Sequence, residues 1–188
     1  MSEPLSSQAA IHVVADPPAP PQLDPIYRAH LGYVWSSLKR LGAAERDLPD
    51  LTQNVFLAVH RQLPSYDPKR PLRLWLFGIA FRVMSNHRRR PAQQREVLEA
   101  PPEQHDDARA ADEQIDERRK RELVLAALGE LEEDRRVVLV MHDLDGHSMP
   151  DIAAELEVGL NTLYSRLRLA RADFLKVAAR LKRARGDE

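Results

Sequence analysis

The stretch from His147 to Arg171, HSMPDIAAELEVGLNTLYSRLRLAR, constrains the fold most, because it predicts two short helices joined by a tight turn. Ser148 can cap the first helix, and Asp151, three residues later, completes a capping box. Pro150 falls in the first turn, where its missing N–H costs no hydrogen bond. The stretch therefore predicts a helix-turn-helix whose first helix begins near Ser148.

The turn and the start of the second helix follow from the next residues. Glu157-Val158-Gly159 interrupts the helical pattern, and Gly159 can adopt the positive φ that a sharp turn requires. Leu160 then opens the second helix, with Asn161 or Thr162 as its cap. We expect this second helix to be long and basic.

The second helix has two distinct faces. The apolar positions recur at steps of three and four and predict a buried face, formed by Leu160, Leu163, Leu167, Ala170, Phe174, Val177 and Leu181. The opposite face carries small polar side chains and arginines, a pattern typical of a helix that reads base edges in the major groove. The candidate DNA-reading residues are Asn161, Thr162, Ser165, Arg166 and Arg168. The alternative is a basic, solvated amphipathic helix without a DNA partner.

Composition excludes several classes of protein. The 188 residues suffice for one domain or two small ones, and no apolar run is long enough to span a membrane. There is no cysteine, so disulfides, thiolate metal sites and cysteine nucleophiles are excluded, and a cytoplasmic location is compatible. The first residues do not resemble a secretory signal.

Catalytic groupings are also missing from the sequence. It has no Gly-rich phosphate loop, no HExxH motif and no nucleophile beside an evident base. Asp143-Leu144-Asp145-Gly146 resembles part of a calcium loop, but the acidic residue that would close such a loop is missing, so we interpret it as a turn. We expect His142 and His147 to be surface residues rather than metal ligands. The sequence therefore predicts neither an enzyme nor a bound cofactor.

The net charge of −1 conceals a strong asymmetry along the chain. Residues 25–90 hold 12 basic and 4 acidic side chains, whereas residues 91–134 hold 6 basic and 14 acidic ones. Residues 160–185 are basic again, with 8 basic side chains against Asp173. Two basic blocks around an acidic connector predict two separate contacts with a polyanion.

The N-terminal half predicts a tail followed by three helices. Residues 1–23 are rich in Pro, Ala and Ser and predict a disordered tail. Helical periodicity begins near Pro25 and ends at Gly42, and a second helix begins at about Leu48. A proline-rich loop then leads into LRLWLFGIAFRVMSNHRRR, so residues 24–91 form one small helical unit.

This third helix is the most aromatic stretch of the chain. Trp75, Phe77 and Phe81 lie among arginines, a combination that suits stacking and phosphate contacts with single-stranded nucleic acid. The competing interpretation is that these large side chains, Trp75 above all, form the core of a three-helix unit.

The remaining segments complete an all-α prediction. Residues 92–116 are acidic and poor in large apolar side chains, which predicts a flexible linker. Helical periodicity returns at about Glu117 and extends to 185 in a second helical domain. The run Val137 to Met141 has strand propensity, but the acidic residues before it favour a helix N-terminus, so we predict helix.

Two segments in this order resemble a bacterial sigma factor of the extracytoplasmic-function (ECF) group. DLTQNVFLAVHRQLPSYD with LRLWLFGIAFRVMSNHRRR resembles region 2 of that family. ALGELEEDRRVVLVMHDLDGHSMPDIAAELEVGLNTLYSRLRLARADF resembles region 4. The resemblance implies a protein that binds RNA polymerase core and directs it to promoters, with region 2 on the melted −10 element and region 4 on the −35 duplex.

The resemblance also implies site residues and partners. The −35 residues are those of the second helix of the helix-turn-helix. The −10 residues are Arg73, Trp75, Arg82, Asn86, Arg88 and Arg89. The residues for the β′ subunit of polymerase core are Asp50, Gln53, Asn54 and Phe56. An anti-sigma factor is a further expected partner, and membrane insertion is not expected.

The sequence departs from the family pattern at several of these positions. Arg82 stands where Asn is frequent, Asn86 where Asp is usual, and Asn54 where an acidic residue is common. In region 4, Gly159, Asn161 and Tyr164 replace the more frequent Pro, Gly and Lys. We therefore expect the fold to be kept and the promoter sequence to differ.

Two rival functions remain. A stand-alone helix-turn-helix regulator accounts for the stretch His147 to Arg171, but leaves the aromatic, arginine-ended helix unexplained. A helical interaction protein without DNA binding would leave both basic faces as solvated surface. Co-purification with polymerase core and the salt dependence of DNA binding separate these alternatives.

Overall fold

The computed structural model describes residues 22–89 and 111–186, and all regular structure in these residues is helical. The predicted all-α class is confirmed. The N-terminal helices are α1 (Leu23–Arg40), η1 (Glu45–Asp47), α2 (Leu48–Gln62), η2 (Leu63–Ser65) and α3 (Leu72–Arg89). The C-terminal helices are α4 (Ala111–Gly129), α5 (Glu133–Leu139), the π-helix η4 (Val140–Leu144), α6 (Met149–Leu156) and α7 (Leu160–Arg185).

The predicted tail and most of the predicted linker lie outside the described residues. The last part of that linker, residues 111–116, is helical, because α4 begins at Ala111 rather than near Glu117. Ion pairs at helical spacing, such as Lys120 with Asp116, support this early start despite the low apolar content. None of the helices in the described ranges is both long and apolar enough to cross a membrane.

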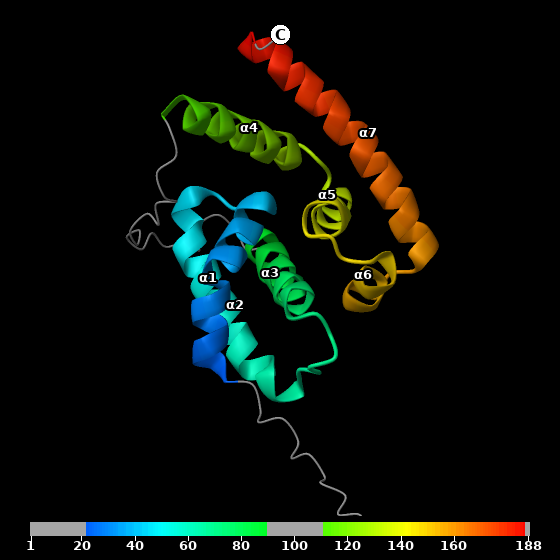
Figure 1. The fold of residues 1–188 in the computed structure, drawn as a ribbon. Helices are drawn as coiled ribbons and strands as arrows, with labels where there is room; N and C mark the ends of the chain where they lie inside the picture. Colours follow the sequence, from blue (N-terminus) through cyan, green and yellow to red (C-terminus); the bar gives the residue numbers. More distant parts are fainter. Residues whose placement is uncertain (1–21, 90–110, 187–188) are drawn as a thin grey trace, which may run out of the picture.

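The middle of helix α3 is the centre of the molecule because it is buried on all sides. Every residue from Leu74 to Ala80 is buried, and this segment, LWLFGIA, contains no polar side chain. A helix that is apolar all round must be covered on more than one face. In the structure, α1 and α2 cover one side of α3 and α6 covers another (Figure 1).

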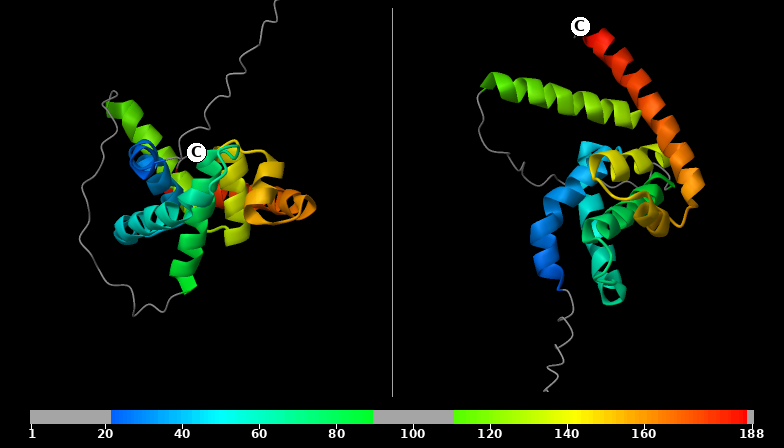
Figure 2. Two further views of the ribbon diagram at one scale, coloured as in Figure 1. Left: turned by 90° about the horizontal axis from the view of Figure 1, so that it is seen from below. Right: turned by 45° about the vertical axis from the view of Figure 1, so that its right-hand side comes forward.

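The C-terminal half wraps around this centre. The long helix α7 packs along α4 and α5, and α6 lies between α7 and α3 (Figures 1 and 2). The run Val137 to Met141 is helical, as predicted, and it is fully buried at the end of α5 and the start of η4. The strand alternative is therefore wrong.

The helix-turn-helix is formed by α6 and α7, and its start is confirmed. The Ser148 hydroxyl accepts a hydrogen bond from the Asp151 N–H at 3.3 Å, and Pro150 lies in the first turn. The predicted turn geometry is wrong in one respect. Glu157, not Gly159, has the positive φ of 55°, because α6 ends in a left-handed cap in which the Val158 N–H reaches the Ala153 carbonyl.

Gly159 has a role other than the one predicted from the sequence. With φ −60° and ψ 140° it is the N-cap of α7, so Asn161 and Thr162 lie inside the helix and are not caps. Their side chains are therefore exposed on the first turn of α7 and free to face a partner.

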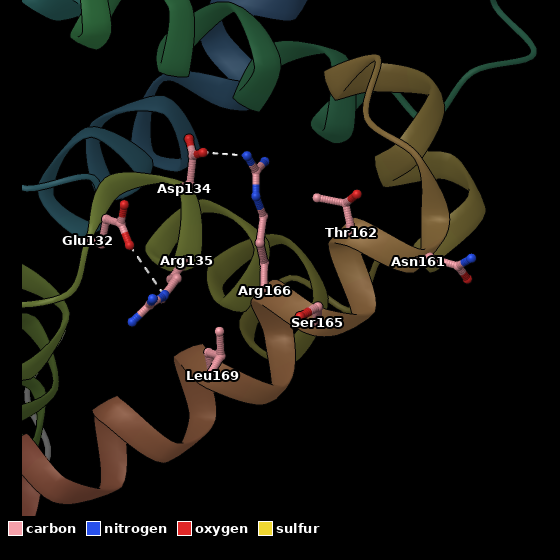
Figure 3. A pocket seen from close by; sticks show the side chains of 8 residues that line it. All are labelled: Glu132, Asp134, Arg135, Asn161, Thr162, Ser165, Arg166 and Leu169. Atoms are coloured by element: carbon pink, nitrogen blue, oxygen red, sulfur yellow. Dashed lines mark ion pairs between the residues drawn. The ribbon is translucent and has the colours of Figure 1, made fainter.

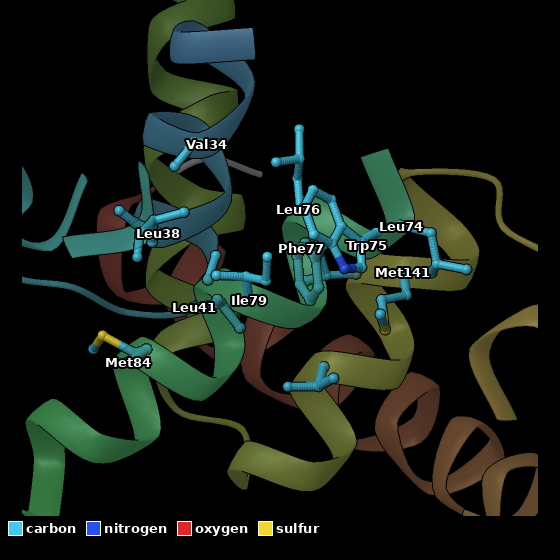
Figure 4. Packing of buried hydrophobic residues seen from close by; sticks show 14 of the residues in the cluster. Val34, Leu38, Leu41, Leu74, Trp75, Leu76, Phe77, Ile79, Met84 and Met141 are labelled. Carbon is cyan, nitrogen blue, oxygen red and sulfur yellow. The ribbon is translucent and has the colours of Figure 1, made fainter. Parts of the chain in front are cut away.

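The two halves share one cluster of buried apolar side chains. Met141 of η4 lies near Leu74 and Trp75 of α3 (Figure 4), and the cluster continues through Ile152 of α6 and Leu163 of α7. Burial of a large apolar side chain contributes about 1.5–3 kcal/mol relative to exposure. The packing of the halves against each other is therefore a substantial part of the fold.

Candidate nucleic-acid and polymerase-binding surfaces

The N-terminal half of α7 faces an open hollow of about 510 Å³. Figure 3 shows that the hollow lies between α7 and the start of α5. Four of the five predicted −35 residues line it, and Arg168, which is exposed, does not. The lining residues are Glu132, Asp134, Arg135, Asn161, Thr162, Ser165, Arg166 and Leu169.

The two arginines predicted to contact bases differ in their surroundings. Arg166 is half-buried and forms an ion pair with Asp134 across the hollow (Figure 3). Arg168 lies on the exposed face of α7, with Ser165 and Asn161 one and two turns before it. Arg168 can therefore reach a base or phosphate directly, whereas Arg166 must share its guanidinium with Asp134.

Asp134 is a site residue that the sequence analysis missed. Its acidic run was interpreted only as the start of a helix, and nothing in the sequence places it opposite Arg166. A carboxylate at this position can orient the guanidinium or accept a hydrogen bond from the cytosine amino group.

The predicted −10 residues all lie on α3, but several of them are engaged within the protein. The Arg73 guanidinium lies 5.3 Å from the centre of the Tyr33 ring. Arg88 donates to the Leu41 carbonyl and pairs with Glu133 at 3.1 Å. Asn86 and Arg89 remain exposed.

Trp75 is buried, with 5% of its surface exposed. Its ring packs against Tyr66, with the two centroids 4.6 Å apart. Trp75 was interpreted either as a base-stacking residue or as a core residue, and the structure supports the core. In this arrangement Trp75 cannot stack on a base and instead supports the loop before α3.

The predicted polymerase-binding residues lie along α2. Gln53 and Asn54 are exposed and Asp50 is half-buried. Phe56 is 5% exposed and packs edge-on against Tyr27, 4.7 Å between centroids, so it has no free surface for a partner. Leu57, which the sequence analysis missed, is 49% exposed and leaves an apolar side chain open to solvent on α2.

Arg136 joins the two halves from inside the core. Its guanidinium donates to the Leu41 carbonyl at 2.6 Å, the Leu131 carbonyl at 2.7 Å and the Gly129 carbonyl at 2.8 Å. Burial lowers the pKa of Arg136, and the neighbouring Arg88 lowers it further. Three carbonyl acceptors compensate for the buried charge, so Arg136 ties the end of α1 to the start of α5.

A second link joins Asp145 to α1. The Tyr33 hydroxyl donates to one Asp145 oxygen at 2.7 Å, and Arg40 pairs with the other at 2.5 Å. Burial raises the pKa of the Tyr33 hydroxyl, and Asp145 raises it further. The turn that was compared with a calcium loop is therefore a turn whose carboxylate contacts α1.

The third link involves Glu155 of α6, whose side chain is 2% exposed. Arg70 lies 2.5 Å from one carboxylate oxygen and Arg82 lies 3.2 Å from the other. Burial raises the pKa of the Glu155 carboxyl, although both arginines act in the opposite direction. A predicted −10 residue, Arg82, is thus occupied by a carboxylate of the helix-turn-helix.

Two family models match this chain, in the order that the sequence resemblance implied. Sigma-70 region 2 matches residues 26–95, and sigma-70 region 4 matches residues 121–174. Together they cover α1 to α3 and most of the C-terminal half.

Curated relatives agree with these matches. ECF RNA polymerase sigma factor SigE of Mycolicibacterium smegmatis is 33% identical over 90% of this chain and 66% of its own length. RNA polymerase sigma factor CnrH of Cupriavidus metallidurans is 30% identical over 71% of this chain and 74% of its own. This chain thus spans about two thirds of the length of SigE.

Two solved structures share the fold. CnrH in complex with the cytosolic domain of CnrY has a TM-score of 0.58 and 26% identity, over 82% of this chain and 86% of CnrH. The sigma factor RpoE of Bartonella quintana, in complex with the anti-sigma factor NepR, has a TM-score of 0.61 over 82% of this chain and 94% of RpoE. At 19% identity, the second likeness concerns the fold alone.

Proposed function

The chain belongs to the ECF group of RNA polymerase sigma factors, and from this premise we propose that it binds polymerase core and directs transcription from specific promoters. The main support for the proposal is that one chain carries two separate basic surfaces, one in each of the two family matches. A polar, basic recognition helix lies in the region 4 match, and an arginine-rich helix lies in the region 2 match. Neither a stand-alone helix-turn-helix regulator nor a helical interaction protein requires both of these surfaces.

We assign the two DNA contacts to the two domains predicted from the sequence, with α4 extending the second domain back to Ala111. Residues 117–185 read the −35 duplex through the exposed start of α7, where Asn161, Thr162, Ser165 and Arg168 face solvent. Arg166 contributes to the same surface from its pair with Asp134. Direct readout at a helix N-terminus suits this exposed polar face.

Residues 24–91 engage polymerase core and the melted −10 element. The core contact is formed by Asp50, Gln53 and Asn54 of α2, with Leu57 as the apolar centre. The −10 contact is formed by the arginines of α3, together with Asn86. Trp75 and Phe56 support these two surfaces from below rather than contacting the partners.

Membership of this family also suggests a regulatory partner and a cellular location for the protein. CnrH is solved with the cytosolic domain of CnrY, and a protein partner of this kind, an anti-sigma factor, is expected for this chain as well. A factor that works on polymerase and DNA acts in the cytoplasm. It performs no catalysis of its own, since the polymerase carries out the chemistry.

Run-off transcription tests the proposal. Purified core is assayed with and without this protein on a pool of genomic promoter fragments, and core alone should start poorly. Discrete transcripts that require the protein support the sigma factor. If DNA binding is salt-sensitive but the protein neither co-purifies with core nor adds any start site, the stand-alone regulator is the better description.

A further inference from the structure

The contact between Glu155 and α3 has the features of an anion-binding site. Two guanidinium groups, from Arg70 and Arg82, hold the two oxygens of one carboxylate. Both contacts join a positively charged donor to a negatively charged acceptor within hydrogen-bonding distance, at 2.5 Å for Arg70 and 3.2 Å for Arg82. The carboxylate has almost no solvent contact, whereas the two arginines are 42% and 47% exposed, so the anion is inserted into a prepared site.

Gly78 gives this site its depth. A Cβ on Gly78 would overlap the Glu155 carboxylate, with Oε1 as the nearest atom. No other described glycine has an acidic group so close. Glycine is the residue that lets a helix backbone approach a ligand this closely, so α3 has a gap in its side-chain layer at the position of the anion.

The loop before α3 holds Arg70 in place. Its N–H donates to the Asp67 carbonyl at 3.0 Å, and its own carbonyl accepts from the Tyr66 hydroxyl at 2.6 Å. Tyr66 in turn packs on the buried Trp75. The backbone of Arg70 is therefore fixed before any ligand arrives, and only the long side chain must adjust.

We propose that Arg70, Gly78 and Arg82 form a binding site for a phosphate of single-stranded DNA, which Glu155 occupies whenever the two halves are packed together. This inference rests on the proposed function and deepens it, since it adds Arg70 and Gly78 to the −10 surface. Carboxylate and phosphate are interchangeable ligands for a pair of arginine forks. The two ligands compete, so DNA can enter only after α6 has moved away from α3.

The balance of energies favours exchange over permanent closure. A buried ion pair loses much of its Coulombic attraction to desolvation, and the raised pKa of the Glu155 carboxyl indicates that desolvation is the larger effect here. Once α6 has moved away, a phosphate of a flexible strand can reach the two arginines on a face of α3 that is open to solvent, so it is desolvated less than the Glu155 carboxylate. The site therefore holds Glu155 only as long as the surrounding apolar packing holds α6.

The first test uses the assembled holoenzyme, in which the halves must be free to separate. Co-purification of the parent protein with core establishes that the proposed function stands before any variant is compared. R70A holoenzyme should then bind a fluorescein-labelled short oligothymidylate more weakly than parent holoenzyme. Its log K against log salt slope should be shallower by about 0.7, the value for one lost phosphate contact on a single strand.

Arg61 provides the matched control, because it is exposed on α2 and its described contact is to a backbone carbonyl of its own helix. R61A should leave both affinity and slope unchanged. If R70A and R61A holoenzymes behave alike while the parent still binds core and initiates transcription, the phosphate site is wrong and the sigma function survives. If the parent does not bind core, the proposed function itself fails.

The second test uses the free protein and asks whether Glu155 blocks the site. The chain has no cysteine, so Gln62→Cys and Ala172→Cys, both at exposed positions, allow a donor and acceptor dye to report separation of the halves. E155Q should lower energy transfer and increase oligothymidylate affinity. The double variant R70A/E155Q should keep the lower transfer but lose the affinity gain.

The control for charge is E157Q, which removes one negative charge two residues away at an exposed position. It should change neither energy transfer nor the affinity for the oligothymidylate. Unchanged transfer in E155Q would overturn the role of Glu155 in holding the halves together. Lower transfer without an affinity gain, or a gain that persists in R70A/E155Q, would overturn the phosphate site.

Discussion

The two surfaces that we propose for DNA differ in one respect that decides how each can act. The start of α7 presents Asn161, Ser165 and Arg168 to solvent, whereas α3 directs Arg73 and Arg82 towards other parts of the same chain. The proposed −35 surface is therefore open in the free protein, whereas the proposed −10 surface is partly covered, with Asn86 and Arg89 still exposed. One recognition surface thus depends on local helix geometry alone, and the other on how the halves are packed.

The largest expected effect comes from breaking the packing at Arg136. R136A would remove the described donor of the buried Leu131 carbonyl and of the Gly129 carbonyl, and it would leave the Leu41 carbonyl with Arg88 alone. Each unsatisfied buried group costs about 1–3 kcal/mol. We expect the free energy of unfolding, measured by urea titration, to fall by about 3 kcal/mol or more.

A surface arginine serves as the control for this prediction. Arg168 is exposed, so R168A should change the free energy of unfolding by less than about 0.5 kcal/mol. If R136A and R168A are equally stable, the bonds from Arg136 do not hold the halves together, and the covered state of α3 has another cause.

The next prediction concerns the exposed surface. R168A should weaken binding of the free protein to its −35 duplex by about 1–3 kcal/mol, the range for one lost base contact. R166A should cost less, because the guanidinium of Arg166 already pairs with Asp134 and must leave it in part to contact DNA. Fluorescence anisotropy with a −35 duplex measures both variants.

Arg183 provides the comparison, since it is exposed on the same helix but near its far end. R183A should bind the duplex almost as well as the parent protein. A result in which R166A is weaker than R168A would mean that Asp134 orients Arg166 for contact rather than competing for it.

The third prediction contrasts two glycines. G78A places a methyl group against Glu155, and overpacking of this kind costs about 1–3 kcal/mol. G32A, in the interior of α1 with no atom near the new methyl group, should instead stabilise the fold by up to about 1 kcal/mol. Thermal unfolding of both variants would show opposite shifts, and a stabilising G78A would contradict the close approach of α6.

The smallest expected effect is on the polymerase surface. Replacing Asp50 and Gln53 by alanine should weaken binding to core by about 1 kcal/mol, because both lie at the rim of the exposed Leu57. L57A alone should cost at least as much. Binding of each variant to the −35 duplex should be unchanged, since α2 and α7 belong to different halves; a loss there would indicate misfolding rather than a lost interface.

The sequence predicted what depends on local pattern. Capping at Ser148 and the apolar periodicity of α7 are properties of neighbouring residues. The cap was confirmed, and Leu163, Leu167 and Ala170 are buried as predicted, but Leu160, predicted to be buried, is 42% exposed. The positive φ was assigned to Gly159 because glycine tolerates it best, but the hydrogen bonding at the end of α6 places it on Glu157. Local preference was overridden there by the geometry of the helix end.

Contacts between distant residues could not be predicted in the same way. Glu155 and Arg82 are separated by 73 positions, and Arg136 and Leu41 by 95. Their charges and polar groups resemble those of ordinary surface residues in the sequence. The apolar segment around Gly78 did contain a usable signal, because a helix with no polar face must be covered on several sides, and this alone predicts close packing of the halves.

The measurement that tests this account most directly is energy transfer between dyes attached at positions 62 and 172 of the double-cysteine variant Q62C/A172C, before and after addition of polymerase core. The account predicts high transfer in the free protein, where α6 covers α3, and a clear loss of transfer once core is bound and transcription begins. Unchanged transfer in a holoenzyme that initiates normally would contradict it, because the −10 surface would then function while still covered.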